Sequence, residues 1–295
     1  MNAMDVPTTS CDPVAVFEKA ETALRRKRRQ RTLFFGLLFL LAVAGSCRVG
    51  EVSISQFIQG LPGLSSYMHD ILPQIHAKSL PADLASWYWA LGKWLSLLLD
   101  TILMAFLATL MGAVGAFCIC FPASRNLVEN YLVYFVCRRI MELARGVPDL
   151  VYALIFVFSF GLGALPGVIA IAIHSIGALG KLFSEVNENI DSMPIDGVKA
   201  AGGNWLQVMR YAVVPQVMPN FTSYTLLRFE INVRAASVIG FVGAGGIGQE
   251  LMFVIRQFIY TDISAIIILI IATVILIDLF CEALRHRIIG GQELL

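Results

Sequence analysis

Long apolar segments separated by shorter polar ones dominate the hydrophobic pattern of this chain. An apolar run of about 20 residues is long enough to cross a lipid bilayer as a helix. The pattern predicts six such spans, at about 32–48, 90–120, a stretch ending near 162, 165–186, 214–240 and 263–284. We therefore expect an all-α, polytopic membrane protein of about six transmembrane helices.

The segments between the spans carry most of the turn-forming and charged residues. Residues 49–88 lack a long apolar run and contain Pro62, Pro73 and Pro81, which predicts an extramembranous loop with short helices. In the third span, the sequence GVP at 146–148 is expected to kink or break the helix, because proline lacks an N–H and restricts the residue before it. Upstream of the first span, residues 13–30 fit either a short amphipathic helix on the membrane surface or a disordered tail.

Composition and charge support a membrane protein and orient it. Hydrophobic residues make up 57% of the chain and charged residues 15%, whereas soluble domains are about 25% charged. The basic run RRKRRQR at 25–31 and RHR at 285–287 flank the first and last spans, and the positive-inside rule assigns such runs to the cytoplasm. Six spans put both termini on that side, together with the polar segment 187–212. We prefer this interpretation of the basic runs to a nucleic-acid patch and expect no nucleic-acid partner.

A glycine-rich segment, FVGAGGIGQE, matches the G-x-G-x-x-G pattern of dinucleotide-binding loops. That pattern has this meaning only after a strand, at the start of a helix in a βαβ unit, whereas here it follows an apolar span on the outer side. A P-loop sequence is also absent, so we expect no ATP site and no cofactor on this chain. We interpret Gly243, Gly245, Gly246 and Gly248 as an outer gate or re-entrant turn, with tight helix packing as the alternative.

Residue types used in catalysis and metal binding do not cluster in the sequence. The six cysteines include no C-x-x-C pair, and the four histidines include no H-x-x-x-H pair. We interpret the cysteines as small apolar side chains rather than as disulfides or zinc ligands. A membrane-embedded enzyme is therefore the weaker alternative, and we assign no catalytic or metal-binding residue.

Charged residues inside the predicted spans are candidates for a polar pathway. A charge at the bilayer centre costs at least about 2.5 kcal/mol on insertion scales, so it rarely faces lipid. Glu230 and Arg234 are four residues apart, an order that suits an ion pair within one helix, while Arg234 equally suits a pathway that attracts an oxyanion. For Arg228 a structural role is favoured over a pathway role. For Arg145, beside the predicted helix break, a cytoplasmic anchor is slightly favoured.

One polar segment, DGVKAAGGNWLQVMRYAVVP, resembles the cytoplasmic loop of permease subunits of binding-protein-dependent ABC importers. That loop has the pattern E-A-A, three residues, G, nine residues and I-x-L-P. The matching positions are Asp196, Gly197 and Val198 for E-A-A, Gly202 for the glycine and Pro215 for the proline. The stretch LLRFEINVRAASVIGFVGAGGIGQEL resembles phosphonate-importer permeases in particular, and the resemblance covers roughly residues 90–287.

The resemblance implies a type I ABC importer permease for a small phosphorus oxyanion such as phosphonate, phosphite or hypophosphite. It implies two copies of the chain in a homodimer, a cytoplasmic ATPase dimer that binds ATP and Mg²⁺, and a periplasmic substrate-binding protein. Transport would proceed by alternating access across the bacterial inner membrane. A methionine-like amino-acid importer permease is the alternative.

The resemblance also divides the chain into parts. We expect a cytoplasmic N-terminal segment at 1–31, the first span and a periplasmic loop at 32–88, the permease core at 89–287 and a cytoplasmic tail at 288–295. A coupling helix is expected near 192–209. The residues implied in ATPase coupling are Asp196, Gly197, Ala201, Gly202, Trp205 and Pro215.

Overall fold

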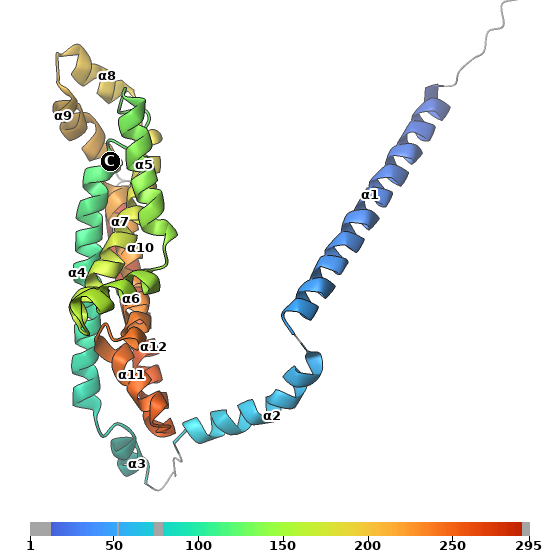
Figure 1. Ribbon diagram of the computed structural model, residues 1–295. Helices are drawn as coiled ribbons and strands as arrows, with labels where there is room; N and C mark the ends of the chain where they lie inside the picture. The colour runs from blue at the N-terminus through green and yellow to red at the C-terminus, as the bar shows by residue number, and fades with distance from the viewer. Residues whose placement is uncertain (1–12, 52, 74–78, 291–295) are drawn as a thin grey trace, which may run out of the picture. The chain divides into compact units, whose positions relative to one another are not determined.

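The computed structural model describes residues 13–51, 53–73 and 79–290, and every regular element in these ranges is a helix (Figure 1). The expected all-α fold is therefore confirmed for the described residues. The outermost parts of the two expected cytoplasmic segments, residues 1–12 and 291–295, lie outside them.

The chain forms two compact units, and the boundary between them along the chain falls between His69 and Asp70. The first contains α1, Pro13–Val49, and most of α2, Ile54–Ile71. α1 runs without a break through the basic run and the first predicted span, because Arg, Lys and Gln are good helix formers. The two elements that we predicted separately are thus one helix of 37 residues. Its apolar side chains between Leu33 and Leu41 are exposed, as expected of a helix that contacts lipid.

The second unit holds three long helices, two bent helix pairs and several short helices. The long helices are α4, Leu91–Cys120, α7, Ala164–Glu188, and α12, Tyr260–Gly290. The bent pairs are α5, Tyr131–Gly146, with α6, Asp149–Phe160, and the segment containing α10, Val214–Ile239, with α11, Gly246–Arg256. The short helices are α3, Leu80–Trp87, α8, Met193–Ala200, and α9, Trp205–Val208, and a π-helical turn, Met209–Val213, joins α9 to α10.

The number of membrane spans agrees with the prediction if each bent pair is one span. By length and composition, four of the described helices can cross a membrane, and the two bent pairs raise the number to six. α6 turns by 84° from α5, at the predicted break. Val147 there is extended, with φ −88° and ψ 127°, as expected of a residue before proline. The carbonyl oxygen of Val147, which lies outside the helix, is 3.1 Å from Nδ1 of His174.

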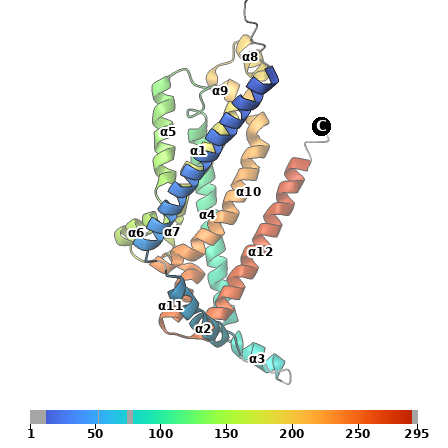
Figure 2. The ribbon, with the colours of Figure 1, turned by 90° about the vertical axis from the view of Figure 1, so that its right-hand side faces the viewer.

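The core of the second unit lies between α4, α7 and α10, which run side by side in both views (Figures 1 and 2). Small residues allow the first two to approach closely, as is common in membrane proteins. A Cβ added to Gly112 of α4 would lie 2.5 Å from Cβ of Ser175 in α7. Nearer the α8–α9 end, Phe183 and Phe221 stack with ring centroids 3.9 Å apart and join α7 to α10.

Candidate functional site

The segment expected to form one coupling helix is broken into α8 and α9. Both lie at the end of the second unit where α12 finishes (Figure 2). Between them Gly202 has a φ of 81°, in the left-handed region that glycine adopts most easily. Asn204 then starts a new helix, because its side chain accepts a hydrogen bond from the backbone N–H of Gln207 and so caps α9. The expected single helix over 192–209 is therefore wrong: a turn and a second helix cap occupy its middle.

The residues implied in ATPase coupling form an exposed surface on this segment. The exposed members are Asp196, Gly197, Ala201 and Gly202, together with Pro215 at the start of α10. Trp205 is 46% exposed, and its indole N–H donates to the carbonyl oxygen of Leu127 at 3.0 Å. Ile195 and Val208 are buried beneath this surface. The segment is thus anchored to the core on one side and open to a partner on the other.

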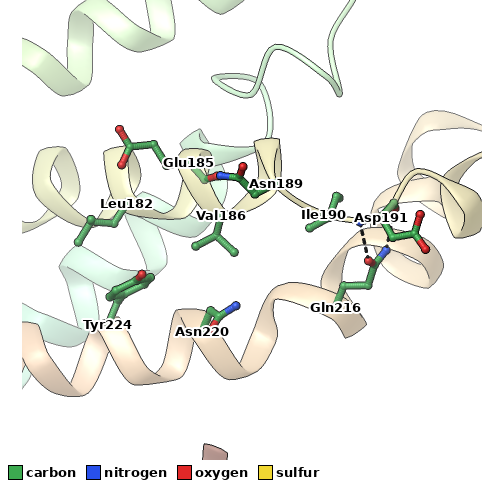
Figure 3. Close-up of a pocket in the computed structure, with 9 residues that line it drawn as sticks. All are labelled: Leu182, Glu185, Val186, Asn189, Ile190, Asp191, Gln216, Asn220 and Tyr224. Carbon is green, nitrogen blue, oxygen red and sulfur yellow. Dashed lines mark hydrogen bonds between the residues drawn. The ribbon is translucent and has the colours of Figure 1, made fainter. Parts of the chain in front are cut away.

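A polar pocket of about 490 Å³ lies where α7 ends and α10 begins. Figure 3 shows that α7 and the chain that follows it form one side of the pocket and α10 forms the other. The residues that line the pocket are Leu182, Glu185, Val186, Asn189, Ile190, Asp191, Gln216, Asn220 and Tyr224. Gln216 accepts from the backbone N–H of Asp191 at 3.2 Å and donates to the carbonyl of Ala212 at 2.7 Å. The carboxylates of Glu185 and Asp191 make the pocket unsuitable for an anion. The bond between Gln216 and Asp191 instead ties the start of α10 to the chain that follows α7.

Glu230 and Arg234 of α10 pair with α12 and not with each other. Arg285 donates to Oε1 of Glu230 at 2.7 Å, and Nη2 of Arg234 lies 2.9 Å from each carboxylate oxygen of Asp278. The ion pair predicted within α10 is therefore wrong, because α12 brings an opposite charge to each partner. Arg145, the other pathway candidate, is exposed in the last turn of α5.

A second polar group lies near the middle of α7 and α10. The side-chain amide of Asn232 donates to Oγ1 of Thr109 at 2.8 Å and to Oγ of Ser175 at 3.0 Å. Nε of Arg228 donates to the same serine oxygen at 3.2 Å. Asn232, Thr109 and Ser175 are buried, and Arg228 is partly buried. Pattern reasoning found Arg228 because of its charge, but it missed the three neutral residues, which come from three separate helices.

The glycine-rich segment forms the turn between α10 and α11, in the half of the second unit away from α8 (Figure 1). Gly243, Gly245 and Gly246 have φ values of 91°, 83° and 71°. The carbonyl of Gly243 accepts from the backbone N–H of Gly163 at 3.0 Å, which joins the turn to the start of α7. A Cβ on Gly248 would overlap a backbone carbonyl of α10. The segment is thus both a turn and a close packing point, and its role as a gate stays a prediction.

These features define a class of protein: a helical membrane subunit with a broken third span and an exposed loop at one end. Residues 123–290 match the family of binding-protein-dependent transport system inner membrane components. This chain belongs to that family.

Two curated relatives have names that state a substrate. The phosphite transport system permease protein PtxC of Stutzerimonas stutzeri is 36% identical over 263 residues, which cover 89% of this chain and 90% of the relative. The second relative is PhnE2 of Escherichia coli strain K12, whose name describes a cryptic phosphonate transport system permease. It is 48% identical over 122 residues, which cover 41% of this chain and all of the relative.

Solved structures show the same fold at low sequence identity. The methionine ABC transporter MetNI, in an inward-facing conformation, has a chain that is 18% identical, with a TM-score of 0.59 and coverage of 68% of this chain and 96% of that one. A bacterial alginate ABC transporter has a chain that is 14% identical, with a TM-score of 0.55 and coverage of 90% and 99%. At these identities the likeness supports the fold alone.

Family membership settles several expectations. The chain is a multi-pass inner-membrane permease subunit and not an enzyme, and it holds no cofactor of its own. A binding-protein-dependent ABC importer also contains an ATPase and a substrate-binding protein, so both are partners of this chain.

Proposed function

We propose that this chain is the permease of an importer for phosphonate or a related phosphorus oxyanion such as phosphite or hypophosphite. The observation that carries this proposal is the similarity to a relative named for phosphite transport over about nine-tenths of both chains. The shorter relative named for phosphonate supports the same chemical class.

The proposed assembly is a homodimer in the bacterial inner membrane with both termini in the cytoplasm. We assign residues 1–31 and 288–295 to the cytoplasm, 32–88 to the first span and a periplasmic loop, and 89–287 to the permease core. The basic runs at both ends support this orientation. An ATPase dimer would bind the exposed surface of α8 and α9 on the cytoplasmic side, and the binding protein would dock at the outer end.

Transport would proceed by alternating access powered by the ATPase subunits. Movement of α8 and α9 would reach α7 and α10 directly, because the Asp191–Gln216 bonds and the buried Ile195 and Val208 connect this segment to both helices. The glycine turn would serve as the outer gate. The candidate residues of the pathway are Arg145, Arg228, Glu230 and Arg234.

A methionine-like substrate is the alternative, and only the fold likeness to the methionine transporter supports it. Substrate-stimulated ATPase activity decides between the two. The permease, reconstituted with its ATPase and binding protein, should be stimulated by phosphite, hypophosphite or methylphosphonate and not by methionine. Stimulation by methionine alone would contradict the proposal.

A further inference from the structure

We propose that Arg228 is the anion-binding group of an oxyanion site inside the membrane-spanning core and that Ser175 and Asn232 hold it in position. The inference rests on the proposed function and deepens it, because it places a substrate contact within the permease itself. Its ligand is a tetrahedral phosphorus oxyanion.

The hydrogen bonds around Arg228 leave one side of its guanidinium unused. An arginine has one N–H on Nε and the rest on two terminal nitrogens. Nε donates to Oγ of Ser175. Neither terminal nitrogen has a hydrogen-bond partner among the described residues, and neither is a buried atom. The terminal fork is therefore unpaired among the described residues, and it is the edge that binds two oxygens of a phosphorus oxyanion at once.

The serine that holds Arg228 is itself held. Asn232 donates to Ser175 and to Thr109, and Ser175 donates to Oδ1 of Asn232 at 3.3 Å. All three side chains are buried. The network therefore fixes the serine oxygen, which in turn fixes the guanidinium plane and the direction of the fork. None of its members is charged, so it orients Arg228 without neutralising it.

Arg228 differs from the other buried or half-buried arginines of the core because no carboxylate pairs with it. Arg138, Arg234 and Arg285 each form an ion pair with an acidic residue, whereas Arg228 forms none with any described residue. α6, which contacts α10, begins with the acidic residue Asp149. Oδ1 of Asp149 accepts from the backbone N–H of Leu150 at the start of α6. The positive charge of Arg228 is thus available to a ligand.

The position of Arg228 also fits a pathway and not a lipid contact. It lies near the midpoint of α10, and a charge there rarely faces lipid because of its high insertion cost. Asp149 at the start of α6 and the ring of His174, which contacts the Val147 carbonyl, both lie at the break between α5 and α6, and α6 contacts α10. Broken helices line substrate sites in other transporters, since irregular backbone at membrane depth is tolerated where it borders a cavity.

Equilibrium binding to the permease–ATPase complex in nanodiscs, without the binding protein, tests the site. The probes are phosphite, phosphate and methylphosphonate, measured by calorimetry. Arg228→Gln should weaken binding about 10- to 100-fold, because it removes charge-assisted hydrogen bonds. Arg228→Lys keeps the positive charge but not the two-nitrogen fork, so its binding affinity should lie between those of Arg228→Gln and the wild type. The matched control, Arg256→Gln, removes an exposed arginine at the end of α11 and should bind as wild type does.

The elution volume and the subunit ratio of the purified complex show whether the Arg228→Gln variant assembles. Two further variants keep the test valid if it does not. Asp149→Asn keeps the side-chain oxygen that accepts from the backbone N–H of Leu150 but removes the competing negative charge, so it should tighten binding about two- to fivefold. Ser175→Ala frees the guanidinium from its anchor and should raise the transport KM while kcat is kept.

Wild-type affinity in an assembled Arg228→Gln complex, or unchanged or weaker binding in Asp149→Asn, would overturn the site. Import of phosphite by the same Arg228→Gln complex at wild-type KM would overturn the site and leave the proposed function intact. A wild-type transporter that imports methionine and none of the phosphorus probes would overturn the proposed function, and the ligand class with it.

Discussion

Two glycine-rich segments of the second unit lie before and after α10 in the chain, and they use glycine for different physical reasons. In the outer turn, a Cβ on Gly248 would overlap the carbonyl of Ser237, and a Cβ on Gly240 would lie 2.7 Å from the Cα of Gly248. In the segment that contains α8 and α9, a Cβ on Gly197 or Gly202 would meet no atom within 4 Å. Gly240 and Gly248 are required by packing, whereas Gly202 is required only by its backbone conformation.

This difference separates a rigid end from an adaptable one. The outer turn is fixed by contacts with α10 and with the start of α7, so a small change there disturbs the core. At Gly197 and Gly202 the α8–α9 segment can change its surface without repacking, although a Cβ on Gly203 would meet Val198, and this open surface suits a region that must fit a partner. The same residue type therefore carries a structural demand at one end and leaves freedom for recognition at the other.

The largest effect is expected for Gly248→Ala. The added methyl group has no space beside the Ser237 carbonyl, and overpacking at a backbone contact should lower the free energy of unfolding by about 3 kcal/mol or more. Fluorescence-detected size exclusion after heating would measure the loss as a lower apparent Tm and a smaller folded peak. A folded peak and Tm equal to wild type would contradict the packing argument.

A smaller loss of stability but a large loss of function is expected for Gly202→Trp. The left-handed backbone should cost the substituted residue about 1–2 kcal/mol, and the side chain projects where the ATPase is proposed to bind. The permease should still fold, while ATPase copurification or substrate uptake is lost. Gly202→Asn is the control, because asparagine tolerates this backbone conformation and carries a small side chain. Normal assembly and uptake in Gly202→Trp would refute the coupling assignment.

The smallest effect, and the only gain, is expected for Gly197→Ala. This residue lies inside α8 in open space, and alanine is a better helix former than glycine by about 0.5–1 kcal/mol. The apparent Tm should stay equal or rise slightly, and uptake should be retained. A drop in Tm as large as that of Gly248→Ala would show that the two segments do not differ as described.

The sequence predicted best those features that depend on local composition. Six spans follow from apolar runs, and the break at Val147 follows from the chemistry of proline, so both agree with the structure. The continuous coupling helix failed because its middle depends on the conformation of Gly202, which glycine permits but does not dictate. α11 was not predicted, because its eleven residues are too few to stand out beside the longer apolar spans.

Contacts between distant segments could not be read from the pattern. Glu230 and Arg234 suit each other by spacing, yet each has its partner on α12, some 44 to 55 residues further along. The network around Arg228 uses Thr109 and Ser175, which are common residues without charge. Periodicity gives the face of a helix on which a residue lies, but only the packing of α4, α7 and α10 decides which faces meet.

The ion pairs between α10 and α12 fix how these two helices align. α12 is the most apolar of the candidate spans, with a mean hydropathy of 2.9, and its isoleucine-rich centre distinguishes poorly between one register and the next. On α10 the acid precedes the base, and on the antiparallel α12 Asp278 precedes Arg285. A slip that brought Asp278 level with Glu230 would place two carboxylates together and leave Arg234, which lies inside a membrane span, without a counter-ion, and an unpaired charge in a span is unfavourable. Four charges therefore encode the register of the last helix as it joins the bundle.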